Sequence, residues 1–296
     1  YNLCAGLLRA VGDSLAALYF LIIAAILNIL LDLYFITQLH LGVQSAGIAT
    51  IIAQGISALL CLLYIRKKVP FLLPHRKDFV WDKELYQDLL SQGLAMGLMT
   101  SIVSIGTVIL QSAINQLGTT IISAQVAARR IMSFAVLPIT AIASSITTFI
   151  SQNFGAEQFQ RIKKGVTIAN LLSWVWSVLV AALLFFTSPS ITSFISGSTN
   201  PDLIANASLY LQISSCFYPI LASLIILRNA LQGMCKKLTP LTSSFIELFG
   251  KIFFVLWIIP HTGYMGVILC EPLIWILMTL QLIIIYRKIR YQLLTE

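Results

Sequence analysis

Eight apolar stretches, each close to the length of a membrane-spanning helix, dominate this chain of 296 residues. They run approximately over 15–37, 43–65, 90–115, 123–150, 166–187, 203–231, 239–260 and 265–287, and residues 1–12 resemble the end of another. About 20 apolar residues cross the hydrocarbon core as a helix, whereas a strand of a membrane barrel needs about 9–11. Because backbone polar groups cannot stay unpaired in lipid, these lengths predict an all-α polytopic membrane bundle.

Composition argues against a soluble protein, and the absence of known motifs argues against an enzyme. Hydrophobic residues make up 58% of the chain and charged residues 10%, against about 45–50% and about 25% in soluble domains. The sequence has no GxxxxGK[ST], HExxH or GxSxG motif, so we predict neither direct use of ATP nor an enzyme, and no cofactor. Its cysteines lack the spacing of a disulfide or zinc framework; they are Cys4, Cys61, Cys216, Cys235 and Cys270.

The net charge of +8 is distributed unevenly between alternate loops. The loops near His40, Gly118, 188–201 and His261 contain no Lys or Arg. The basic residues lie in the other loops and the tail, namely Arg66, Lys67, Lys68, Arg76, Lys77, Lys83, Arg161, Lys163, Lys164, Arg228, Lys236, Lys237, Arg287, Lys288 and Arg290. This alternation predicts cytoplasmic basic loops and a cytoplasmic C-terminus in an inner (plasma) membrane. Orientation explains most of the positive charge, with anionic lipid contact as a smaller contribution and no nucleic-acid partner.

A loose internal repeat relates residues 15–68 to 238–290. His40-Leu41-Gly42-Val43 corresponds to His261-Thr262-Gly263-Tyr264, and Tyr64-Ile65-Arg66-Lys67 to Tyr286-Arg287-Lys288-Ile289. Many transporters are built by such duplication. Residues 89–225 have no counterpart before the first copy, and the chain begins at Tyr1 rather than Met. We therefore expect a chain that lacks roughly its first three helices.

The longest basic loop separates the two predicted halves. Pro70 and Pro74 break its first part, and Trp81, Leu85 and Leu89 then follow at helical spacing among charged residues. This pattern predicts a short amphipathic helix on the inner membrane surface. The expected organisation is an N-terminal part over 1–68, a cytoplasmic linker over 69–88 and a C-terminal part over 89–296.

Asp32 is the most informative ionisable residue of the apolar segments. It lies nine residues before the turn at Leu41, and Thr50 lies nine residues after that turn, so an antiparallel hairpin places both at a similar depth. Asn28 and Gln54 pair in the same way one turn deeper. Such an oxygen-rich cluster suits a proton or Na⁺. An interhelical hydrogen-bond clasp, with Asp32 held neutral by Asn28, is the alternative.

The other ionisable residues favour structural roles. Glu247 and Lys251 have the i, i+4 spacing of a helical ion pair. Arg129 and Arg130 lie shortly after the Gly118 turn, where one of them could reach the interface. Glu271 is expected at the interface near an external helix end. Three prolines are expected to interrupt or kink their helices, namely Pro138, Pro219 and Pro272.

Several motifs resemble the MATE (multidrug and toxic compound extrusion) family. They are Leu8-Arg9-Ala10-Val11-Gly12-Asp13-Ser14, Asn28-Ile29-Leu30-Leu31-Asp32, Gly42-Val43-x-x-Ala46-x-x-Ala49-Thr50 and Gln152-Asn153-Phe154-Gly155-Ala156 with Arg161-Ile162. The resemblance implies two pseudo-symmetric six-helix lobes, of which this chain supplies the end of the fourth helix through the twelfth. About 130–150 N-terminal residues would then be missing. It also implies a monomeric antiporter that exports cationic or amphipathic organic molecules in exchange for Na⁺ or H⁺.

The DinF-like branch of that family has a cation site that Asn28, Asp32 and Thr50 match. In the same resemblance Asn2 matches a substrate-lining position, and Gln54 is a second candidate for contact with substrate. Other branches place acidic residues on the seventh and tenth helices, but the segments 90–117 and 203–227 contain no Asp or Glu. A cation site of that kind is therefore not expected in the C-terminal half.

Two alternatives to drug export remain. The first is a flippase for lipid-linked sugars from the same superfamily, although such proteins often carry two more helices and a cavity lined by Arg and Lys. The second is a scaffold that does not transport. An upstream first helix that carries an Asp would support transport, whereas a true start near Tyr1 would support the scaffold.

Overall fold

The computed structural model describes residues 1–40 and 42–295, with side chains through residue 289. Its regular elements are helices, and that part of the chain contains no strand, so the predicted all-α membrane bundle is confirmed. The chain divides into two compact units, and the boundary lies between Lys83 and Glu84. This division lies inside the range 69–88 that the sequence suggested as a linker.

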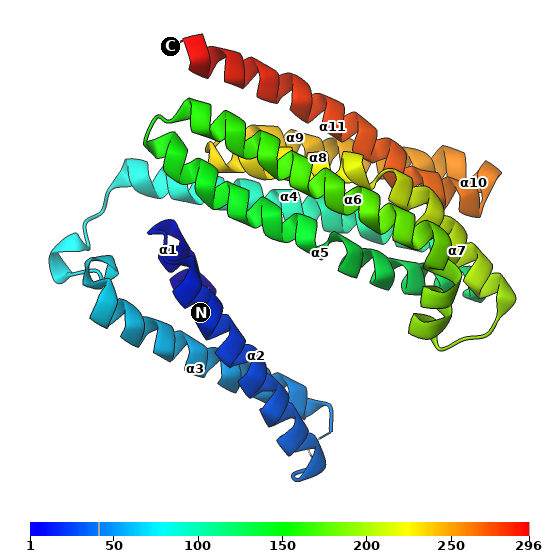
Figure 1. The fold of residues 1–296 in the computed structure, drawn as a ribbon, viewed down its shortest axis with the longest axis horizontal. Helices are drawn as coiled ribbons and strands as arrows, with labels where there is room; N and C mark the ends of the chain where they lie inside the picture. The colour runs from blue at the N-terminus through cyan, green and yellow to red at the C-terminus, as the bar shows by residue number, and fades with distance from the viewer. Residues whose placement is uncertain (41, 296) are drawn as a thin grey trace. The chain divides into compact units, whose positions relative to one another are not determined.

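The first unit is built around one long helical hairpin (Figure 1). A short helix, α1 (Asn2–Ala10), precedes α2 (Ser14–Thr37) and α3 (Gln44–Lys68). Asp13 begins α2, because its side chain accepts a hydrogen bond from the Ala16 amide at 3.1 Å. The buried face of α3 repeats every four residues and is mostly small, as Ser45, Ala49, Ala53, Ser57, Cys61 and Ile65. Small residues let the two helices approach closely, and the Ser57 hydroxyl donates to the Phe20 carbonyl at 2.8 Å.

The segment after α3 differs in one respect from the prediction. Two short 3₁₀ helices, η1 (Pro70–Leu72) and η2 (Arg76–Asp78), follow α3, and α4 (Lys83–Asn115) then begins. Leu85 and Leu89 therefore belong to the first turns of the spanning helix α4, and the expected separate surface helix is wrong. No Gly or Pro stands between Lys83 and the apolar segment, so nothing in the backbone chemistry ends a helix there.

The second unit contains α4 and, packed around the same core, the remaining helices. They are α5 (Thr119–Gly155), α6 (Phe159–Ser196), α7 (Pro201–Cys216), α8 (Tyr218–Gly233), α9 (Leu238–Phe253), the π-helix η3 (Phe254–Ile258), α10 (Ile259–Thr262) and α11 (Tyr264–Thr295). Its largest fully buried side chains include Tyr210 and Tyr218. Helices α5 and α6 run side by side in the foreground of Figure 1, drawn in green.

One of the eight predicted spans is broken. Within the described residues, seven helical segments are long and apolar enough to cross a membrane, and α7 with α8, bent by 57°, gives an eighth if the pair is counted as one span. The bend lies at Phe217, two residues before Pro219. Because Pro219 has no amide hydrogen, it cannot donate to the carbonyl four residues earlier. By contrast, Pro138 and Pro272 lie inside continuous helices.

The internal repeat is visible as two antiparallel hairpins. The first is α2 with α3, and the second is the segment 238–262 with α11. Both turn at a glycine with positive φ, +60° at Gly42 and +58° at Gly263. A side chain at either position would strain the backbone, which explains why both copies retain glycine there. Leu41, the predicted centre of the first turn, lies outside the described residues.

Candidate functional site

Asn28 and Thr50 come together across the hairpin of the first unit. The Asn28 amide nitrogen Nδ2 donates to Thr50 Oγ1 at 3.3 Å, and the Thr50 hydroxyl donates to the Ala46 carbonyl at 2.7 Å. Counting residues from the turn predicted that α2 and α3 would place polar groups of these helices at similar depths. The hydrogen bond joins Thr50 to Asn28, one turn deeper than its expected partner Asp32. With its proton used on Ala46, Thr50 presents only oxygen lone pairs to further partners.

Asp32 has an unsatisfied carboxylate oxygen. Its Oδ1 is buried and, among the described residues, has no hydrogen-bond partner. No hydrogen bond connects Asp32 with Asn28 in that part of the chain; the interhelical hydrogen bond of this cluster joins Asn28 to Thr50 and leaves Asp32 out. A buried carboxylate without a partner is costly unless it takes up a proton or a cation. Asn28, one turn away on the same helix, places a neutral amide beside it.

The remaining candidates of the first unit are more loosely placed. Gln54 and Asn2 are both exposed. Within the described residues no three His, Cys, Asp or Glu side chains gather in a way that could hold a metal ion. A cation at Asp32 would therefore be shared between one carboxylate and neutral oxygens, which is a hard-ligand set suited to Na⁺.

A second polar cluster lies within the other unit, on α4, α8 and α9. Lys251 Nζ is 2.8 Å from Glu247 Oε1, with side-chain exposures of 4% and 14%. The predicted helical ion pair is therefore present and buried. Lys251 also donates to the Thr107 hydroxyl at 3.5 Å. An added methyl at Gly106 would lie 3.0 Å from Lys251 Cδ, so this glycine leaves room for the lysine stem.

Arg228 belongs to the same cluster, although its sequence position suggested a residue at a loop. It lies inside α8 with 16% of its side chain exposed, and its Nη2 is 3.9 Å from Glu247 Oε2. The same nitrogen donates to the Ser243 hydroxyl at 2.9 Å, while the Arg228 Nε is buried without a partner among the described residues. Two cations thus share one carboxylate, and the cluster carries a formal charge of +1.

Glu271, which the sequence placed near an external helix end, forms a third buried group within the bundle. It is 8% exposed, its Oε1 lies 3.2 Å from Arg129 Nη2, and its Oε2 accepts a hydrogen bond from Tyr210 at 2.9 Å. Arg129 is therefore paired within the bundle and does not extend to the interface. Arg130, the next residue, is exposed and lines a hollow near Leu203.

Sequence reasoning could not find these two partnerships. Arg129 and Glu271 are 142 residues apart, and the contact depends on how α5, α7 and α11 pack. Arg228 lies only five residues before the end of α8, so its place in the sequence matches that of an ordinary basic loop residue. The signal in the sequence that could have pointed to these contacts is that Glu247 and Glu271 are each the acidic residue of an apolar segment, and a buried acidic residue in a membrane bundle requires a partner.

Comparison with known proteins gives a consistent family. Residues 95–257 match the MatE family model. The chain is 27% identical over 250 residues to the probable multidrug resistance protein YpnP of Bacillus subtilis, covering 83% of this chain and 55% of that protein. It is also 27% identical over 286 residues to an FAD transporter of Shewanella oneidensis, covering 92% of this chain and 61% of that protein. The chain thus spans little more than half the length of these relatives.

A solved structure shares the fold. The crystal structure of a MATE protein in its bent conformation matches with a TM-score of 0.89 at 20% sequence identity. The match covers 99% of this chain and 66% of that protein. At this identity the likeness concerns the fold, and it includes the helices of both units.

Proposed function

Because the chain belongs to the MatE family of membrane transporters, we propose that it acts in a secondary antiporter that exports cationic or amphipathic organic compounds. The coupling ion is Na⁺ or H⁺. The observation that carries this proposal is the buried Asp32 Oδ1 without a partner, beside the hydrogen bond between Asn28 and Thr50. The activity belongs to the whole transporter, and this chain contributes the coupling residues of the α2–α3 hairpin.

The geometry suggests how an ion would act on the hairpin. A proton on Asp32, or Na⁺ held by Asp32 with the Asn28 and Thr50 oxygens, would remove the cost of the one buried, unpaired oxygen of Asp32, Oδ1. The ion therefore favours whichever conformation buries Asp32 most. For exchange to be coupled, the organic substrate must favour the opposite conformation or compete for the same oxygens. Asn2 and Gln54, both exposed in the first unit, are the proposed contacts for substrate.

The decisive test replaces Asp32 with Asn in the full-length transporter. Asp32→Asn keeps the shape of the side chain but removes its charge and its titratable proton. We expect normal expression, residual binding of substrate and loss of ion-driven export of a fluorescent cation. Asp202→Asn, a matched change at an exposed residue in the first turn of α7, should export normally. Export by Asp32→Asn at the wild-type rate against a gradient would show that Asp32 is not the coupling site.

An anionic substrate is a second candidate. Arg228, Glu247 and Lys251 form a buried cluster of charge +1, and Arg228 Nε still has an unused donor among the described residues. A carboxylate or phosphate group would complete the hydrogen bonding of this arginine. The relative with the widest coverage reported above is an FAD transporter. Competition decides between the candidates: a flavin nucleotide that inhibits cation efflux in wild type, but not in Arg228→Gln, favours the anion.

A further inference from the structure

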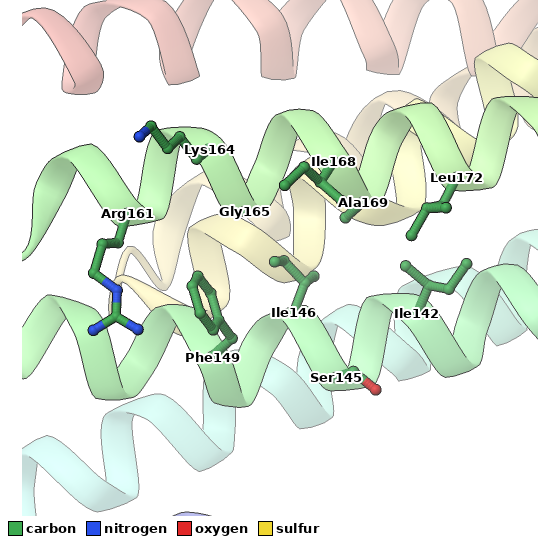
Figure 2. A pocket seen from close by; sticks show the side chains of 10 residues that line it. All are labelled: Ile142, Ser145, Ile146, Phe149, Arg161, Lys164, Gly165, Ile168, Ala169 and Leu172. Carbon is green, nitrogen blue, oxygen red and sulfur yellow. The ribbon is translucent and has the colours of Figure 1, made fainter.

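A groove runs between α5 and α6 on the second unit (Figure 2). Its volume is about 410 Å³. Apolar side chains from both helices line most of its length, including Ile142 and Ile146 from α5 and Ile168 and Leu172 from α6. Ile168 and Leu172 are 57% and 54% exposed. An apolar surface of this kind in a membrane protein is suited to a lipid chain.

Both positive charges of the groove lie at one end. Arg161 and Lys164 are in the first two turns of α6, next to the loop that joins it to α5. The Arg161 guanidinium carbon lies 6.0 Å from the centre of the Phe149 ring, which holds the arginine over the end of the groove. Within the described residues, neither Arg161 nor Lys164 forms an ion pair with an acidic side chain. Their charges are therefore available to an anionic ligand.

Gly165 shapes the groove between its two ends. A methyl group added there would lie 2.5 Å from Phe149 Cε1 and 3.3 Å from Ile146 Cδ1. The missing side chain therefore lets the Phe149 ring pack directly against α6. In Figure 2 the ring lies between α5 and α6 beside Arg161, so the charged end of the groove includes an aromatic surface.

The length of the groove matches one leaflet of a bilayer. Arg161 and Leu172 are eleven residues apart on a continuous helix, which corresponds to about 16 Å at 1.5 Å per residue. Half of a hydrocarbon core about 30 Å thick is about 15 Å. A ligand that places its anionic group at Arg161 and its apolar part along the groove would therefore reach close to the bilayer centre.

We propose that this groove binds an anionic phospholipid. Its phosphate lies between Arg161 and Lys164, and one acyl chain follows the groove toward Ile142 and Leu172. With the orientation predicted from the basic loops, this lipid belongs to the cytoplasmic leaflet. A symmetric pair of chains is the less suitable occupant, because a twofold axis along the membrane normal would bring both copies of Arg161 and Lys164 to the same level.

The test compares phosphatidylglycerol with phosphatidylcholine of the same acyl chains, added to the purified full-length transporter and counted by native mass spectrometry. Wild type should retain phosphatidylglycerol preferentially. Arg161→Gln with Lys164→Gln should lose this preference, by roughly fivefold per basic side chain and about 25-fold for the pair. The matched control, Lys163→Gln with Lys236→Gln, removes two basic residues that do not line the groove and should bind as wild type does.

A second variant tests the apolar part without changing charge. Ser145 lines the groove, and Ser145→Trp should fill it and reduce retention of phosphatidylglycerol while Arg161 and Lys164 remain. Equal retention of the two lipids by wild type would overturn the proposal. So would an equal loss in the control pair. A purified wild type that is dimeric and becomes monomeric in Ser145→Trp would instead assign the groove to a second copy of the chain.

Discussion

The ionisable side chains buried in the spans differ in whether they have a partner. Glu247, Lys251 and Arg228 share one cluster, and Arg129 is paired with Glu271. Asp32, among the described residues, has a buried oxygen without a hydrogen bond. Paired charges tolerate burial, whereas an unpaired carboxylate changes its energy strongly when it gains a proton or a cation. This contrast separates residues that hold the fold from the residue proposed to couple transport.

Glu247 should be more important for stability than Lys251. Glu247→Leu leaves two buried cations without their carboxylate and is expected to cost about 3–5 kcal/mol. Lys251→Met should cost less, because Glu247 keeps Arg228 at 3.9 Å. Thermal unfolding of the purified variants measures both changes, with Lys236→Met as an exposed control. If Lys251→Met is the more damaging substitution, Arg228 does not compensate Glu247.

Full recovery of stability after the loss of Glu247 should require replacing all three charged residues of the cluster. Glu247→Leu with Lys251→Met still leaves Arg228 buried without a carboxylate, so this pair of substitutions should restore stability only in part. Adding Arg228→Met should restore the remainder and most export. A triple variant that is stable but does not transport would place the cluster in the mechanism, as the second candidate substrate requires.

The hydrogen bond of the Tyr210 hydroxyl should contribute more to the stability of the fold than that of the Tyr264 hydroxyl. Tyr210 donates to a charged carboxylate, and such bonds contribute about 1.5–3 kcal/mol, whereas the Tyr264 bond to the neutral Gln125 amide contributes about 0.5–1.5 kcal/mol. Tyr210→Phe should therefore lower the unfolding temperature more than Tyr264→Phe does. Equal shifts in the same thermal assay would indicate that Glu271 does not depend on the tyrosine.

The elements were predicted better than the contacts. Seven of the eight apolar windows match helical segments long enough to cross a membrane and the eighth matches the bent pair α7–α8, because crossing a bilayer fixes both the length and the composition of a helix. The end of α3 and the start of α4 were less certain, since helix continuation past Lys83 depends on local backbone chemistry and not on hydrophobicity. Local counting from a turn paired Thr50 with Asp32, whereas the hydrogen bond joins Thr50 to Asn28, 22 residues away and one turn deeper. The same counting could not find Arg129 near Glu271.

The bend between α7 and α8 should depend on Pro219. Pro219→Ala restores an amide hydrogen and allows a continuous helix. Spin labels at positions 202 and 236, in a variant without the native cysteines, should move apart by roughly 6 Å if a 57° bend becomes straight. The Pro138→Ala variant, whose helix is already continuous, is the control. An unchanged distance would show that packing around Phe217 sets the bend.

At the scale of the whole molecule, the distribution of basic residues predicts how the chain is oriented in the membrane. The basic residues of the segment between α3 and α4 and of the first two turns of α6 are predicted to face the cytoplasm. The C-terminal tail should face the same side, although the Arg290 side chain lies outside the described residues. The groove proposed to hold an anionic lipid depends on the same assignment, because its charged end is at the α5–α6 loop.

Cysteine labelling tests this orientation in intact cells. Lys77→Cys, in a variant without the five native cysteines, should resist a reagent that cannot cross the membrane and should react after the cells are opened. Thr199→Cys, an exposed residue between α6 and α7, should react in intact cells. Labelling of Lys77→Cys before opening would reverse the topology.

The close packing of α3 against α2 also has a mechanical consequence. Buried residues follow one another every four positions from Ser45 to Ile65, so the two helices are joined along most of their length. The hairpin is therefore expected to move as one rigid body about 37 Å long, which is the length of the 25 residues of α3. A tilt of 5° about the end near Asp32 would displace Lys68 by about 3 Å. On the function proposed for Asp32, small rearrangements around that carboxylate would be amplified where the chain leaves the membrane.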